Sequence, residues 1–256
     1  MTNISLKSMA AVSSICCNTS IGDNRIYSIL AIGQSNMAGR GSLMEVSAIN
    51  NPKCHMLRMG RWQPLSDPVN VDRRITPGSF SSGVGPMASF ADMMNQQTGR
   101  QIGIIPCADG GTKICQWQPG EVLYDHAVFM TQLAMRSSVF SGIIWHQGES
   151  DARSTKQEDY YVSLCRMVET IRQDLHAQSL PFVMGRLSDK IGKSWNIPLD
   201  GIYGINEQID RCAAKYEKMS VVDVSDLELQ SDEVHFSAAS ARVLGKRYAE
   251  AFLSLI

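Results

Sequence analysis

Residues 26–33 of the chain read IYSILAIG, and the polar segment QSNM follows directly at 34–37. A short apolar run that ends in a glycine is typical of a strand buried on both faces of a parallel sheet. Runs of the same kind, rich in Val and Ile, occur at Gln101–Ala108, Ser141–Gly148, Pro181–Leu187 and Met219–Ser225. The sequence therefore predicts a central, mostly parallel sheet of five strands.

Helical patterns separate these runs. Within Gln157–His176, apolar residues recur at intervals of three and four and form one face. The pattern returns in Ala238–Leu255, with Ser237 at the position of an N-cap. Because strands and helices alternate to the end of the chain, we expect an α/β fold with helices on both faces of an open sheet. Functional groups of such folds lie at the carboxyl ends of the strands.

The segment Gly39–Phe80 interrupts this alternation. It contains several Pro and Gly residues and one short predicted strand at His55–Met59. A segment of that length inside a compact domain is more often a functional loop than a linker. We expect residues 26–256 to form a single domain and residues 1–25 to form an N-terminal extension that can be flexible.

Composition and charge exclude two classes of partner. The 256 residues carry 24 Lys and Arg against 25 Asp and Glu, and the basic residues are scattered. Binding to a nucleic-acid backbone requires a concentrated positive surface, so we expect no nucleic-acid partner. No apolar run approaches the roughly 18 residues that cross a bilayer, so we expect no membrane partner. Composition indicates no particular oligomeric state.

Cysteine usage and the start of the chain indicate the compartment. The seven cysteines include no C-x-x-C pair, so neither a disulfide framework nor a zinc ribbon is expected. The apolar stretch Met9–Cys17 is weak and is interrupted by serines, unlike a strong cleaved signal. We therefore interpret the protein as cytoplasmic, with export as the alternative. His126 and His146 lack metal-ligand spacing, so no metal is predicted.

Ser35 follows the first predicted strand within GQSNM at 33–37. A serine at such a junction can present its hydroxyl at the sheet edge, with backbone N–H groups nearby to donate to a ligand. Met37 stands where the G-x-S-x-G elbow of other hydrolases has its second glycine. Taken alone, Ser35 is better explained as a turn residue that caps the next element.

Asp232 and His235 lie three residues apart, just before the last predicted helix. This spacing lets the carboxylate reach the Nδ1–H of the imidazole and fix the tautomer whose Nε2 accepts a proton from a hydroxyl. Taken alone, the pair can be a solvated turn followed by a helix-start residue. Ser35 supplies a hydroxyl that needs a base, and the pair supplies a base that needs a hydroxyl. Considered together, they predict Ser35 as nucleophile, His235 as base and Asp232 as acid.

Polar residues also crowd the end of another predicted strand, in WHQGESD at 145–151. Side chains of this kind at a strand end have no packing purpose. The amide of Gln147 can donate to a developing oxyanion, and Glu149 can serve as a second carboxylate for His235. The alternative is that these residues tie the loop to neighbouring backbone.

A glycine pair follows the strand that ends near Ala108. Gly110 and Gly111 let a backbone N–H approach a ligand closely, as a second oxyanion donor must, although a plain turn also explains the pair. Trp117 can wall a sugar or acyl pocket or lie in the core. Asn36 and Trp117 are the candidate substrate-binding residues.

In this order along the chain, GQSNM at 33–37, GG at 110–111, HQGE at 146–149 and D-x-x-H at 232–235 resemble the SGNH (GDSL-like) hydrolases. The closer resemblance is to the branch that contains sialate O-acetylesterases and acetylxylan-esterase-like carbohydrate esterases. It extends from about Ile26 to the C-terminus. It implies a three-layer α/β/α sandwich of flavodoxin-like type and a reaction that needs no cofactor.

The resemblance also implies roles for individual residues. Ser35 would be the nucleophile and His235 the general base and acid. The oxyanion hole would combine the Ser35 N–H, an N–H of Gly110 or Gly111, and the Gln147 side chain. Members of the branch can use the carboxylate before the histidine, the glutamate of HQGE, or both, and we favour Asp232 with Glu149 as helper.

The expected function is that of a serine esterase acting through an acyl-enzyme on Ser35. Its substrate would be a small-molecule or oligosaccharide acetyl ester, such as an acetylated glycan or an acetylated sialic acid. Two alternatives remain at this stage: a lipid or thioester hydrolase of the same superfamily, and a carbohydrate-binding module without turnover.

Overall fold

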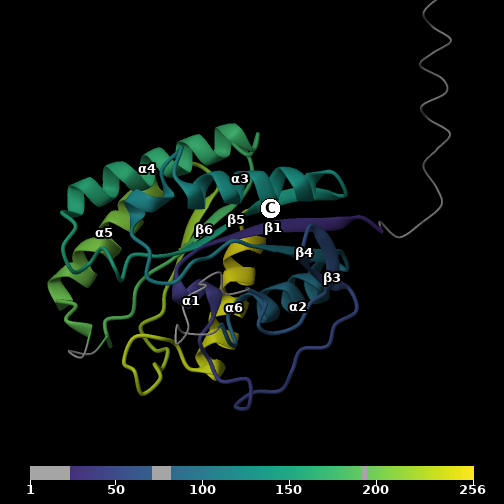
Figure 1. The fold of residues 1–256 in the computed structure, drawn as a ribbon, viewed down its shortest axis with the longest axis horizontal. Coiled ribbons are helices and arrows are strands. Elements are labelled where there is room, and N and C mark those ends of the chain that lie inside the picture. The colour runs from purple at the N-terminus through teal and green to yellow at the C-terminus, as the bar shows by residue number, and fades with distance from the viewer. Residues whose placement is uncertain (1–23, 71–81, 192–194) are drawn as a thin grey trace, which may run out of the picture.

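The computed structural model describes residues 24–70, 82–191 and 195–256, which form a sheet covered by helices on both faces (Figure 1). The strands are β1 Ile26–Gly33, β2 Cys54–Arg58, β3 Arg61–Pro64, β4 Gln101–Pro106, β5 Ser138–His146, β6 Phe182–Gly185 and β7 Met219–Val222. The helices are α1 Ser35–Ala38, α2 Met87–Thr98, the 3-10 turn η2 Ile114–Trp117, α3 Val122–Met135, α4 Gln157–Asp174, α5 Leu199–Lys215 and α6 Ala238–Leu253.

Among the described residues the sheet has seven strands in the order β3-β2-β4-β1-β5-β6-β7. The five predicted strands are confirmed as its contiguous parallel part, from β4 to β7. The sheet has two strands more than the five expected, because the hairpin β2–β3 extends one edge. The short strand predicted at His55–Met59 is β2, and it pairs in parallel with β4.

The hairpin partner β3 was not predicted because it has no apolar run. Its sequence, RWQP, is short and largely exposed, and only a two-residue turn separates it from β2. That turn consists of Met59 and Gly60, both with positive φ, as tight hairpins require. Local turn geometry rather than burial therefore extends the sheet at this edge.

The predicted three-layer sandwich is confirmed. Helices α3, α4 and α5 cover one face of the sheet, and α2 and α6 cover the other (Figure 1). Strand β1 supplies both layers in alternation, because Leu30 and Ile32 belong to the first core and Ile29 and Ala31 to the second. The N-cap expected at the last helix is also confirmed, since the Ser237 side chain accepts the N–H of Ser240.

The topology brings the carboxyl ends of β4, β1 and β5 side by side. Gly33 at the end of β1 pairs with His146 at the end of β5, and a Cβ on Gly33 would lie 2.1 Å from the His146 carbonyl oxygen. The N–H of Gln34 donates to that same carbonyl, and the N–H of Asp109 donates to the Gly33 carbonyl. The segments after these three strands therefore meet at one rim.

The N-terminal extension predicted at 1–25 lies almost entirely outside the described residues, so the predicted domain boundaries stay a prediction. Within the described ranges, no helix combines the length and the apolar character that crossing a bilayer requires.

Candidate active site

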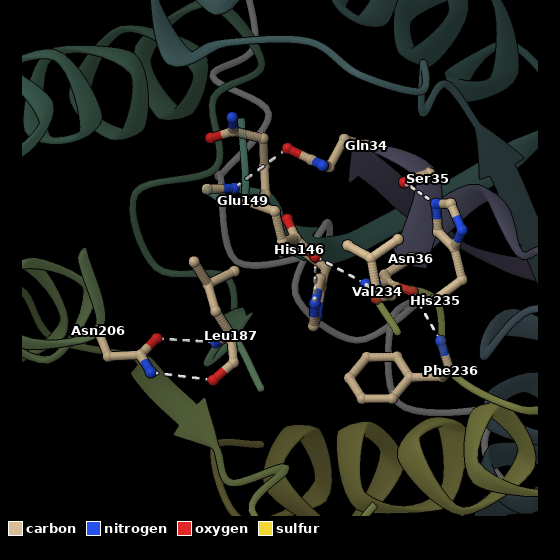
Figure 2. A network of polar contacts seen from close by, with 12 residues as sticks. Gln34, Ser35, Asn36, His146, Glu149, Leu187, Asn206, Val234, His235 and Phe236 are labelled. Atoms are coloured by element: carbon tan, nitrogen blue, oxygen red, sulfur yellow. Dashed lines mark hydrogen bonds and ion pairs between the residues drawn. The ribbon is translucent and has the colours of Figure 1, made fainter. Parts of the chain in front are cut away.

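Ser35, His235 and Asp232 form a continuous hydrogen-bonded line at this rim (Figure 2 shows the Ser35 to His235 contact). The Oγ of Ser35, at the start of α1, lies 2.8 Å from Nε2 of His235. The opposite ring nitrogen, Nδ1, lies 2.6 Å from Oδ2 of Asp232. The structure thus brings together the three residues that the sequence predicted as nucleophile, base and acid.

The other carboxylate oxygen of Asp232 fixes the loop that carries His235. Oδ1 accepts the backbone N–H groups of Val234 and His235, each at 3.0 Å. Burial alone would raise the pKa of Asp232, but these N–H groups and the His235 ring outweigh it and hold the pKa below its ordinary value. An ionised Asp232 requires the proton of the neutral imidazole on Nδ1, which leaves Nε2 free to accept a proton from Ser35.

A pocket that is open to solvent contains Ser35 and His235 in its wall. Its walls come from the ends of β1, β4 and β5 and from the loops around 195 and 234. The lining residues are Gln34, Ser35, Arg40, Gly110, Gly111, Glu149, Ser150, Arg153, Trp195, Ile197, Val234 and His235.

Ser35 and the glycine pair 110–111 line the same pocket. Within the described part of the chain, the N–H groups of Ser35 and Gly111 donate to no protein acceptor. Gly110 lies so close that a Cβ on it would be 3.6 Å from the Ser35 Cβ and 2.5 Å from the Arg40 Nη2. The predicted proximity of the glycine pair to Ser35 is therefore observed, and this wall can receive negative charge on an oxygen.

The structure does not direct the Gln147 amide toward Ser35, where the sequence predicted an oxyanion donor. Its side-chain N–H groups donate to the Thr112 carbonyl at 2.8 Å and to Asp151 Oδ2 at 2.6 Å, which uses both protons of the amide. Gln147 is completely buried and is absent from the pocket wall. The alternative reading, that this residue ties the loop to neighbouring backbone, is the observed one.

The two candidate substrate-binding residues, Asn36 and Trp117, lie outside the pocket wall. Trp117 is buried in the core, where it packs edge-on against Trp145 and donates to Thr112. Asn36 is buried beneath the serine, and its amide is used by the protein itself, with Glu149 as one partner. Neither side chain lines the pocket.

Glu149 does line the pocket, but it does not occupy the position of the triad acid. Both ring nitrogens of His235 are already engaged, by Ser35 and by Asp232. The Glu149 carboxylate accepts a hydrogen bond from Asn36 and lies 3.7 Å from Nε2 of His146. The structure therefore favours Asp232 as the acid partner of His235, and the expected direct assistance from Glu149 is not observed.

Sequence reasoning missed several pocket residues. The Trp195 indole packs edge-on against His235 and donates to the Asp232 carbonyl at 2.6 Å. Arg153 lies over the face of Trp195, and Arg40 reaches the glycine pair. Gln34 accepts the Gly148 N–H, and its side chain lines the pocket (Figure 2). Of these residues, only Gln34 could have been identified from the sequence as a pocket residue, because it directly precedes Ser35.

Metal-binding side chains do not gather here. Among residues 24–70, 82–191 and 195–256, no group of three or more His, Cys, Asp or Glu side chains is close enough to hold an ion.

Comparison with known proteins agrees with this geometry. A curated Arabidopsis thaliana protein, described as a probable carbohydrate esterase, is 30% identical over 254 residues, which span 91% of this chain and 92% of the relative. An X-ray structure of an Arabidopsis thaliana protein has a TM-score of 0.78 at 28% identity and covers 90% of this chain and 98% of its own. NanS has a TM-score of 0.71 at 18% identity, covers 90% of this chain and 97% of its own, and shows that the fold is shared.

The family assignment rests on nearly the whole chain. Residues 25–254 match the family described as carbohydrate esterase, sialic acid-specific acetylesterase. The same fold occurs in a lipase/acylhydrolase from Enterococcus faecalis, with a TM-score of 0.51 at 14% identity. The chain therefore belongs to the sialic acid-specific acetylesterase family of carbohydrate esterases, and it is a carboxylic ester hydrolase with the SGNH fold.

Proposed function

We propose that this protein removes O-acetyl groups from a carbohydrate through an acetyl-enzyme formed on Ser35. The observation that carries the proposal is the line of contacts Ser35 Oγ to His235 Nε2 at 2.8 Å and His235 Nδ1 to Asp232 Oδ2 at 2.6 Å. A hydroxyl becomes a competent nucleophile when an adjacent base accepts its proton and a third group orients that base.

In the first half of the reaction, Ser35 Oγ attacks the carbonyl carbon of the acetyl ester while its proton passes to His235 Nε2. Collapse of the tetrahedral intermediate breaks the ester C–O bond, and the imidazolium returns the proton to the departing sugar oxygen. In the second half, His235 takes a proton from water, the hydroxide attacks the acetyl carbon, and acetate leaves as the proton returns to Ser35 Oγ.

The negative oxygen of each tetrahedral intermediate would lie against backbone donors. The N–H of Ser35 and an N–H of the pair Gly110 and Gly111 are the candidates, because they border the same pocket. Gln147 is no longer among them. The Gln34 side chain is the third candidate donor, since its Oε1 accepts the Gly148 N–H and its NH₂ group donates to no acceptor among the described residues.

The family and the lining of the pocket both support an acetylated carbohydrate as the substrate class. The aromatic ring of Trp195 and two cationic residues, Arg40 and Arg153, line the pocket that contains Ser35. Aromatic and polar groups of this kind suit a hydroxylated sugar better than a long acyl chain. The acetylated carbohydrate class is accordingly favoured over lipid and thioester substrates.

The test is an acetate-release assay with p-nitrophenyl acetate and with a panel of acetylated sugars, including an O-acetyl sialic acid and an acetylated xylan fragment. Wild-type protein should release acetate, and Ser35→Ala should not. Ser179→Ala, at an exposed serine far along the chain, is the control and should behave as wild type.

Three outcomes would contradict the proposal. Sugar binding without acetate release would indicate a non-catalytic module. Preference for eight-carbon over acetyl esters would indicate a lipid or thioester hydrolase. Unchanged acetate release by Ser35→Ala would show that Ser35 is not the nucleophile.

A further inference from the structure

We propose that Glu149 is a positioning residue that holds His235 in line with Ser35 by orienting the side-chain amide of Asn36. This inference rests on the proposed function, because it concerns how the same catalytic histidine is placed. It assigns to the HQGE glutamate a role different from that of a triad acid.

Asn36 contacts the backbone on both sides of the catalytic histidine. Its Nδ2 donates to the carbonyl of Val234 at 3.1 Å, and its Oδ1 accepts the N–H of Phe236 at 3.1 Å (Figure 2). These are the residues immediately before and after His235. Since Asn36 follows Ser35 directly in α1, one buried side chain fixes the nucleophile segment and the base segment relative to each other.

The clamp works in only one orientation of the amide. If the Asn36 side chain were rotated by half a turn, its oxygen would face the Val234 carbonyl and its NH₂ group would face the Phe236 N–H, so both contacts would be lost. Glu149 Oε1 lies 2.7 Å from Asn36 Nδ2. An ionised carboxylate can only accept, so it selects the orientation that the clamp needs.

Glu149 is held in a state in which its side chain can only accept hydrogen bonds. It is 2% exposed, and burial alone would raise its pKa. The neighbouring His146 and the Asn36 amide outweigh burial and lower the pKa of Glu149 below its ordinary value, which keeps the carboxylate ionised.

A second buried contact anchors the other end of this network. His146 Nδ1 lies 2.7 Å from the Tyr248 hydroxyl on α6, and both side chains are fully buried. Gly185 at the end of β6 makes room for the pair, because a Cβ there would lie 2.1 Å from the Tyr248 oxygen. The His146 ring also packs edge-on against Phe236. The Glu149 carboxylate is thereby placed with respect to α1, β5 and the loop before α6.

The decisive experiment is a double-mutant cycle on the whole protein with Glu149→Leu, Asn36→Leu and the double variant. Leucine is close in size to both side chains but makes none of their hydrogen bonds, so the stability of each variant has to be measured beside its kinetics. If Glu149 acts through Asn36, each single variant should lower kcat for p-nitrophenyl acetate about tenfold to a hundredfold, with KM changed less than about threefold. The double variant should be no slower than Asn36→Leu, because the clamp is lost only once.

Glu149→Gln provides the readout that a merely structural role would not give. Its side chain retains an acceptor oxygen for Asn36 without the charge, so it should recover most of the kcat that Glu149→Leu loses. Glu169→Leu, which removes an exposed carboxylate that accepts from Lys215 and Tyr216, controls for the loss of a glutamate elsewhere. Midpoints of thermal unfolding identify any variant that fails to fold, in which case Asn36→Ala and Glu149→Gln complete the cycle.

The results for Ser35→Ala and for the double-mutant cycle distinguish a failure of this inference from a failure of the proposed function. If wild-type protein is active, Ser35→Ala is inactive and the two losses in the cycle multiply, Glu149 acts independently of Asn36 and the inference is wrong. It is also wrong if Glu149→Gln is as slow as Glu149→Leu, because the charge would then matter rather than the orientation of the amide. If Ser35→Ala retains full activity, the proposed function fails first and the inference fails with it.

Discussion

Asp232 Oδ2 lies 2.6 Å from Nδ1 of His235, while Oδ1 of the same carboxylate accepts the N–H of His235 at 3.0 Å. One carboxylate therefore fixes both the backbone and the ring of His235, the proposed catalytic base. The lowered pKa of Asp232 keeps it ionised, so that the imidazole holds its proton on Nδ1 and turns Nε2 toward Ser35.

This relationship predicts the effect of Asp232→Asn. The amide can present an N–H to Nδ1 and thereby favour the wrong tautomer, so kcat for acetyl esters should fall by about a thousandfold or more, as in other serine hydrolases. Steady-state kinetics of purified protein measures the loss. Asp226→Asn, at an exposed carboxylate paired with Arg247, should stay near wild type. A larger loss from Glu149→Gln than from Asp232→Asn would transfer the acid role to Glu149.

Gln147→Ala should reduce stability rather than catalysis. The substitution removes the side-chain donor of the buried Thr112 carbonyl and one of three donors to the Asp151 carboxylate, which should cost about 2 kcal/mol in the free energy of unfolding. Urea unfolding measures that cost, and kcat of the folded fraction should change less than about tenfold. Gln118→Ala, which removes an amide that donates to two carbonyls away from the pocket, is the matched control. A hundredfold loss of kcat at unchanged stability would indicate that Gln147 donates to the oxyanion.

Trp195→Phe isolates the hydrogen bond between the indole and the catalytic loop. Phenylalanine keeps an aromatic wall beside His235 but cannot donate to the Asp232 carbonyl. We expect kcat to fall about threefold to tenfold, the value of one hydrogen bond. Trp62→Phe, which removes an indole donor to Ser137 on the exposed edge strand, should leave kcat unchanged. Equal kinetics of the two variants would show that the Trp195 hydrogen bond does not support the loop.

Acid should destabilise the fold in part through Asp232. Because its pKa is lower in the folded state than the ordinary value of 3.8, its contribution is complete above pH 3.8 and is lost as pH falls through the folded value. Urea midpoints measured between about pH 5 and pH 3 should therefore decline less steeply for Asp232→Asn than for wild type. An equal or steeper decline would mean that Asp232 is not stabilised in its ionised form.

The sequence predicted those features that depend on local spacing or on burial. The five core strands were recognisable because each is an apolar run, and Asp232 was placed correctly because three residues of separation in a loop bring a carboxylate to Nδ1 of the histidine. The proximity of Asp232 and His235 to Ser35 was expected because functional groups of such folds lie at the carboxyl ends of the strands.

The structure departs from the sequence-based expectations mainly in the direction in which side chains point. Gln147 and Asn36 both stand in motifs next to functional residues, but each amide turns inward to satisfy buried backbone groups. Trp195 contacts the catalytic histidine from a segment that carries no periodic pattern. These orientations depend on tertiary contacts between distant segments, which one sequence does not reveal.

The most direct test of the account is the capture of the intermediate. Wild-type protein mixed with an activated acetyl ester and quenched rapidly in acid should carry one acetyl group, and peptide mapping by mass spectrometry should locate it on Ser35. The acetyl group should be absent from Ser35→Ala treated in the same way. Acetylation of another residue, or full ester hydrolysis by Ser35→Ala, would contradict the central claim.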